Sequence, residues 1–89
     1  MDDLRDIAHF VEVARTRNFS QAAARLGVPA STLSRRIAEL EAGLGTQLLV
    51  RTTRRVDLTE AGALFLSRCE EIVEAARGAR AELSDWARR

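Results

Sequence analysis

Residues 19–37 carry the sequence FSQAAARLGVPASTLSRRI, which predicts two short helices joined by a glycine turn. Ala23 is small enough to let two helices cross closely, and Gly27 supplies the positive φ that the turn requires. The apolar residues of this stretch are spaced to share one core: Leu26, Val28, Leu33 and Ile37. The pattern is a helix-turn-helix, which leaves the other face of its second helix available for a groove of duplex DNA.

The second helix of this motif carries its polar residues opposite its apolar ones. We expect it to begin near Pro29 or Ser31, since proline suits a first helical turn and serine an N-cap, and to end before Gly45. At about 100° per residue, Leu33, Ile37, Leu40 and Leu44 form one stripe, Ser31, Arg35 and Ala38 lie opposite, and Thr32, Ser34 and Arg36 lie on the flanks. Small hydroxyl residues around two arginines favour groove binding over a plain solvated face.

The charge of the chain is divided unevenly along its length. The net charge of the 89 residues is only +1, but residues 25–55 hold six arginines and two glutamates, a net charge of +4, and the remainder carries −3. Such asymmetry is typical of a surface that meets phosphates.

Two short β-leaning runs follow the helix-turn-helix. Leu48–Arg51 and Val56–Leu58 flank the polar segment Thr52–Arg55, which predicts a hairpin, or wing. The turn lacks glycine and asparagine, so a two-residue primed turn is not supported. Arginines at the tip can reach phosphates or a narrow minor groove; the alternative is an exposed basic turn with no ligand.

Helices are also predicted on both sides of this region. Apolar residues recur at helical spacing between about Asp3 and Thr16, at positions 4, 7, 8, 11 and 14, which indicates an amphipathic scaffold helix. Ser20 is predicted to cap the next helix and Thr59 the last one.

The last helix carries a heptad seam. Its members are separated alternately by four and three residues: Phe65, Cys69, Ile72, Ala76, Ala79, Leu83 and Trp86. A helix from Thr59 to about Ala87 would be roughly 40 Å long. Because that length outruns a small domain, we expect a second chain to cover the seam. The alternative is that the seam folds back on the first helix of its own chain.

Composition argues against several other classes of protein. No apolar run approaches the roughly 20 residues needed to span a bilayer, and the N-terminus lacks the order of a signal peptide, so we expect a soluble, cytoplasmic protein without membrane contact. Cys69 is the single cysteine and is expected to be a small buried side chain; His9 is expected to be an exposed or partly buried helix residue. With no metal-ligand cluster and no phosphate loop, we predict no enzyme activity, metal or cofactor.

Five motifs together resemble the N-terminal domain of LysR-type transcriptional regulators of bacteria. They are Asn18–Ala23, Leu33–Ile37 with Leu40–Glu41, Leu44–Gly45, Arg51–Arg54 and Leu58–Gly62, in the order and spacing of that family. The resemblance implies a mainly α fold: a winged helix-turn-helix of three helices and a two-stranded wing in residues 1–58, then a long linker helix in residues 59–89 through which two chains dimerise. It also implies a pseudo-palindromic DNA operator containing A/T pairs.

The resemblance assigns DNA-binding roles by position. The recognition residues of the family fall on Ala30, Ser31, Thr32, Ser34 and Arg35, and its minor-groove arginine falls on Arg54. Many members have glutamine where this chain has Ala30, and alanine can touch a thymine methyl but cannot make the bidentate bond to adenine. Arg35 can bond guanine or a phosphate, and we expect it to read a base. Shorter contacts to bases or phosphates are expected from Ser31, Thr32 and Ser34, while Arg36, Arg51 and Arg55 are expected to act mainly through their charge.

Members of this family continue into a larger domain that binds a small-molecule effector. The present sequence stops before such a domain, so we expect it to be a DNA-binding fragment. The alternative from another class is a winged-helix module whose basic face meets an acidic protein, because a winged helix does not oblige its owner to bind DNA. Such a module would more plausibly expose apolar anchors on its third helix.

Overall fold

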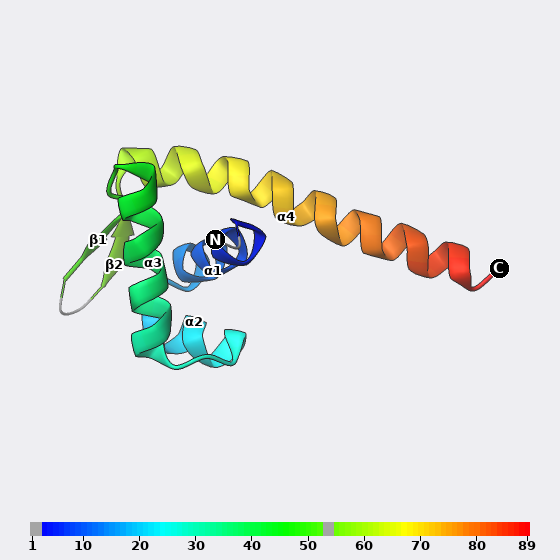
Figure 1. Cartoon of the computed structure of the whole chain (residues 1–89), viewed down its shortest axis with the longest axis horizontal. Helices are drawn as coiled ribbons and strands as arrows, with labels where there is room; N and C mark the ends of the chain where they lie inside the picture. The colour runs from blue at the N-terminus through cyan, green and yellow to red at the C-terminus, as the bar shows by residue number, and fades with distance from the viewer. Residues whose placement is uncertain (1–2, 53–54) are drawn as a thin grey trace.

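A computed structural model describes residues 3–52 and 55–89 of the chain. Within these residues it contains four helices and one two-stranded antiparallel sheet. In chain order the elements are α1 (Asp3–Thr16), α2 (Phe19–Leu26), α3 (Ala30–Leu44), β1 (Leu49–Arg51), β2 (Val56–Leu58) and α4 (Glu60–Ala87). Helices α1, α2 and α3 pack together, the hairpin lies at one side of α3, and α4 runs past α1 and away from the rest (Figure 1). The predicted mainly α winged helix-turn-helix with a long last helix is confirmed.

One apolar core joins the three helices, the hairpin and the beginning of α4. Its largest fully buried side chains are Phe10, Val13, Leu33, Ile37, Leu48, Leu49 and Cys69. The stripe predicted for α1 is shifted, because Leu4 and Ala8 are exposed while Phe10 and Val13 face the core. Leu44, placed in the α3 stripe, is also 46% exposed and does not belong to the buried core.

The ends of the helices follow capping chemistry. The side chain of Asn18, rather than Ser20, accepts the bond from the backbone N–H of Gln21, at 2.9 Å, so the predicted serine cap is wrong. Asparagine is as good an acceptor, and its earlier position lets the helix begin at Phe19. Helix α3 begins at Ala30, after Pro29, which forms no side-chain cap bond. Gly27 and Gly45 end α2 and α3 with φ of 71° and 70°, as their sequence positions predict.

The start of α4 is fixed tightly against the residues that lead into β1. The Thr59 hydroxyl accepts a bond from Gly62 N at 2.9 Å, which confirms the predicted cap, and Thr59 N donates to Leu48 O at 3.0 Å. Gly62 is buried so closely here that a Cβ would lie 2.0 Å from Leu48 O. The direction in which α4 leaves the domain is therefore set by backbone contact.

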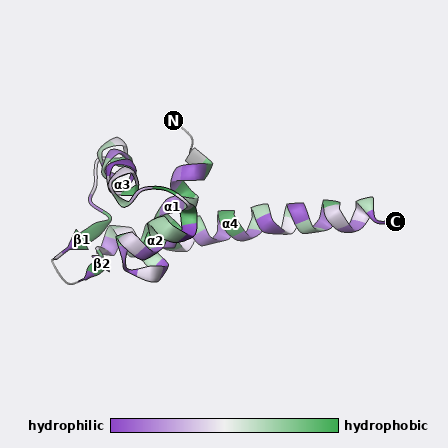
Figure 2. Cartoon of the chain, turned by 90° about the horizontal axis from the view of Figure 1, so that it is seen from below, coloured by the Kyte–Doolittle hydropathy of each residue, from purple (hydrophilic) through white to green (hydrophobic). Residues whose placement is uncertain are grey.

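The predicted seam of α4 divides into two parts. Phe65 packs on Phe10 of α1, with ring centroids 5.3 Å apart, and Cys69 is completely buried in the core of its own chain. This corrects the prediction for the first part of the seam, since Cys69 has no exposed surface to offer a second chain. From Ile72 onward the seam residues are exposed, up to Leu83 and Trp86, although Val73 beside them is partly buried against the core. Figure 2 shows apolar residues recurring among polar ones along this extended part of α4. In the described part of the chain, no helix is long and apolar enough to cross a membrane.

Candidate nucleic-acid interface

Helix α3 presents its polar residues away from the core, because Leu33 and Ile37 on its other face are buried against α1 and α2. The predicted recognition residues form one continuous surface along its N-terminal half. Ala30, Ser31 and Arg35 are exposed, and Thr32, Ser34 and Arg36 are half-buried. The first two turns of α3 therefore offer small side chains that let a groove approach the backbone closely.

Arg35 extends from the middle of this surface. Its Nη1 donates to Glu39 Oε1 one turn later, at 2.9 Å, and both side chains are more than 60% exposed. An exposed pair at this spacing contributes only about 0.3–0.5 kcal/mol. The guanidinium can consequently exchange this carboxylate for a base edge or a phosphate at small cost.

Arg51 has a role that its charge alone did not predict. Its Nη1 donates to the Ser34 hydroxyl at 2.6 Å, and its guanidinium carbon lies 4.1 Å from the centroid of the Phe19 ring. A cation over an aromatic face is stabilised by the ring quadrupole. Arg51 thus joins strand β1 to the first residue of α2 and to the exposed side of α3.

The hairpin is held to α3 by a carboxylate. Glu41 Oε2 accepts bonds from the backbone N–H groups of Leu48, at 2.7 Å, and Leu49, at 3.1 Å. The strands pair antiparallel, with Arg51 opposite Val56, and Thr52 N donates to Arg55 O at 2.9 Å. The predicted wing is confirmed, whereas Arg54, the predicted minor-groove residue, lies outside the described residues.

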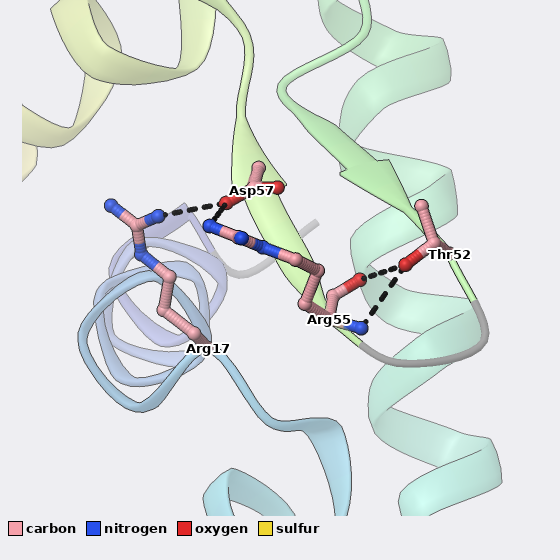
Figure 3. Close-up of polar contacts among 4 residues, drawn as sticks. All are labelled: Arg17, Thr52, Arg55 and Asp57. Carbon is pink, nitrogen blue, oxygen red and sulfur yellow. Dashed lines mark hydrogen bonds and ion pairs between the residues drawn. The ribbon is translucent and has the colours of Figure 1, made fainter.

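A second basic cluster lies between α1 and the hairpin and was missed in the sequence. Asp57 Oδ1 accepts bonds from Arg17 Nη1, at 3.0 Å, and from Arg55 Nη2, at 2.8 Å. Arg17 comes from the end of α1 and Arg55 from the hairpin, and both point to Asp57 (Figure 3). Arg17 lies outside residues 25–55, where the positive charge of the sequence is concentrated, although it directly precedes the Asn18 cap and is therefore a turn residue.

The residues with possible catalytic or redox chemistry lie away from this surface. His9 is buried on α1, more deeply than expected. Cys69 is buried as predicted, and desolvation raises the pKa of its thiol from 9.0 to about 11. Among the described residues, no group of histidine, cysteine and acidic side chains could hold a metal ion.

Known proteins share this sequence and arrangement. Residues 4–63 match the family model described as bacterial regulatory helix-turn-helix protein, lysR family. A probable hydrogen peroxide-inducible genes activator of Mycobacterium avium is 60% identical over 67 residues, 75% of this chain and 22% of that protein. An HTH-type transcriptional regulator of Xanthomonas campestris pv. campestris is 50% identical over 70 residues, 79% of this chain and 20% of that protein. The chain thus spans about a fifth of the length of these relatives.

Solved structures agree with the sequence relatives. The BenM DNA-binding domain in complex with catB site 1 DNA is 32% identical, with a TM-score of 0.87 over 94% of this chain and 93% of that one. The CbnR DNA-binding domain in complex with DNA is 38% identical, with a TM-score of 0.82 over 97% of this chain and 98% of that one. The family model covers more than half of the chain, and the domains in the two DNA complexes match this chain over almost its whole length. This chain belongs to the LysR family of bacterial regulatory helix-turn-helix proteins.

Proposed function

We propose that this chain is the sequence-specific, double-stranded DNA-binding part of a bacterial transcriptional regulator. The observation that carries the proposal is the single surface formed by the exposed polar side of α3 and the arginine-rich hairpin beside it. A helix fits the major groove, and a basic hairpin next to it meets the backbone or the adjacent minor groove. The BenM and CbnR domains, with the same fold, have been crystallised with DNA.

Within this surface each residue receives a role suited to its chemistry. Arg35 reads a base, Ala30 touches a thymine methyl, and Ser31, Thr32 and Ser34 make short contacts to bases or phosphates. Arg36 and Arg55 contribute mainly charge, and Arg54 enters the minor groove. Ser34 and Arg51, bonded to each other, also shape the surface itself.

The chain acts as a homodimer in this proposal. Residues 1–58 form the DNA-binding domain and residues 59–89 the linker helix, whose exposed apolar residues meet a second copy. A two-fold dimer places one α3 in each of two successive major grooves, so its operator is pseudo-palindromic. A small-molecule effector would bind only in a further domain of the whole regulator. Because a transcriptional regulator works at the chromosome, we place it in the bacterial cytoplasm and assign it no enzyme activity.

The decisive experiment is selection of a randomised duplex pool by the purified chain, followed by sequencing of the retained duplexes. We expect an inverted repeat with half-site centres about 10 bp apart, or a multiple of that distance. Enrichment of a single half-site would support sequence-specific DNA binding but contradict binding as a dimer. Equally weak binding of every sequence would contradict the proposal and favour the interaction module.

A further inference from the structure

A hollow of about 230 Å³ lies between the α1–α2 turn and the hairpin. Three arginines line it, Arg17 from the end of α1, Arg51 from β1 and Arg55 from the hairpin, together with the hydroxyl residues Ser20 and Thr52. We call this group of five residues the basic hollow. It gathers guanidinium groups from the α1–α2 turn and from the hairpin, and cationic N–H donors are the chemistry that an anion requires.

The charges around the basic hollow are only partly balanced. Asp57 is the carboxylate that Arg17 and Arg55 share, and both guanidinium groups bond the same oxygen, Oδ1. Arg51 bonds a neutral hydroxyl and an aromatic ring. Each guanidinium has five N–H donors, and Arg17 uses one of them on Asp57 while half of its side chain stays exposed. The three arginines thus exceed this carboxylate by two positive charges, and their donors remain accessible from solvent.

The backbone of Arg17 provides an independent observation. Its φ is 56°, and it is the one non-glycine residue with positive φ between residues 3 and 52 and between 55 and 89. It directly follows the last residue of α1, a position where glycine is the usual choice. A non-glycine residue in this left-handed region is strained, and such residues cluster at functional sites. At this position the side chain points to Asp57 (Figure 3), and Arg17 is among the residues that line the hollow.

We propose that Arg17, together with Arg55, forms a binding subsite for one phosphate of the DNA backbone, with Asp57 holding both guanidinium groups in place. This inference rests on the proposed function and extends the DNA surface from α3 and the hairpin to the α1–α2 turn. The ligand is a phosphodiester monoanion, which guanidinium groups bind through paired N–H donors. Such a contact fixes the register of the domain on the duplex but carries no sequence information.

The test compares substitutions at Arg17 with one at Arg15. Arg17→Gly and Arg17→Ala both remove the guanidinium, but glycine relieves the positive φ whereas alanine keeps it. Arg15→Ala is the matched control: it removes the same charge two residues away, from an arginine that pairs with Glu70 of α4 at 3.3 Å. Each protein is titrated at several salt concentrations with the selected duplex and with a shuffled duplex of the same composition.

We expect both Arg17 variants to weaken binding by the same factor on the two duplexes. The slope of log K against log salt should become shallower by about 1, the value for one phosphate contact, and Arg15→Ala should leave it unchanged. Slopes equal to that of Arg15→Ala would overturn the subsite while leaving DNA binding intact. If the loss of DNA affinity paralleled the loss of melting temperature, and both were larger for Arg17→Ala than for Arg17→Gly, Arg17 would have a structural role. That result would also overturn the subsite. If the unaltered chain bound neither duplex, the proposed function itself would fail.

Discussion

At the scale of single residues, the contacts of Arg51 show how one side chain can organise a surface. Its guanidinium is stacked on Phe19 and bonded to Ser34, so it meets α2 and α3 at once. If Ser34 faces DNA only while Arg51 holds it, the two residues act as one unit. Contributions of residues that act together do not add.

A double-mutant cycle measures this coupling. We expect Ser34→Ala and Arg51→Ala to weaken binding of the selected duplex, and the double variant to lose less than the sum, with a coupling energy of about 0.5–3 kcal/mol. The control cycle combines Ser34→Ala with Arg15→Ala, whose guanidinium pairs with Glu70 of α4 and not with Ser34, so additivity is expected. Strict additivity in the first cycle would mean that Ser34 and Arg51 contact DNA independently.

The buried thiol of Cys69 makes stability depend on pH. Burial raises its pKa from 9.0 to about 11, so at pH 10 the unfolded chain has lost the thiol proton and the folded chain has kept it. The stabilisation is therefore complete below pH 9 and is lost as the pH rises to about 11, with a slope of up to about 1.4 kcal/mol per pH unit. Urea unfolding of the chain and of Cys69→Ala between pH 8 and 11 checks this. A parallel decline in both proteins would assign the effect to other groups.

At the scale of elements, the position of α4 depends on a glycine that is pressed against backbone. A Cβ at Gly62 would lie 2.0 Å from Leu48 O, so Gly62→Ala must displace the start of α4 or the residues leading into β1. We expect a loss of about 1–3 kcal/mol in the free energy of unfolding. Gly78→Ala is the control in the same helix, since a Cβ added there would have no atom of the same chain within 4 Å, and alanine should add about 1 kcal/mol to the free energy of unfolding. Thermal unfolding followed by circular dichroism should give shifts of opposite sign.

The elements themselves were largely predictable, because helix periodicity and cap residues are local properties of the sequence. The C-terminal end of α3 could be predicted from Gly45, because glycine is the usual residue there. The start of α4 could be predicted from Thr59, because threonine is a good N-cap. The cap of α2 was misplaced because Asn18 and Ser20 are both competent acceptors only two residues apart. Periodicity also could not show that α1 turns Phe10, rather than Leu4, toward the core.

Contacts between residues far apart in the chain could not be predicted from the sequence, because they depend on how the elements pack. Arg17 and Asp57 are forty residues apart, and only the packing of the hairpin beside the end of α1 brings them together. The polar residues of α3 were found because they share one helix. The heptad seam of α4 was found too, but a repeat does not say which surface covers it. In the structure Cys69 is buried in the core of its own chain, whereas Leu83 is exposed.

At the scale of the whole molecule, the chain has an unequal distribution of apolar surface. It measures 51 Å along its longest axis and 25 and 23 Å across, because the second half of α4 extends beyond the core. Leu83 and Trp86 are about two-thirds exposed on this extension, and Ile72 about two-fifths. Complete burial of a fully exposed side chain of this kind contributes about 1.5–3 kcal/mol, so burying Leu83 or Trp86 against a second chain would contribute about two-thirds of that, and burying Ile72 less. The exposed half of the seam would thus be stabilised by a partner.

The double variant Leu83→Ser and Trp86→Ser tests whether two copies of the chain contact each other through the outer half of α4. We expect it to remain folded, since neither residue belongs to the core, but to sediment as a monomer at concentrations where the unaltered chain is a dimer. Leu4→Ser is the control, because Leu4 is equally exposed but lies on α1. Two linked domains bind two half-sites with an effective concentration that separate domains lack, so affinity for the inverted repeat should fall about 10²-fold or more. Affinity for a single half-site should stay the same, because the α3 surface and the hairpin are unchanged.

A variant that remained dimeric would contradict this prediction, because the contact between copies would then lie elsewhere than on the outer half of α4.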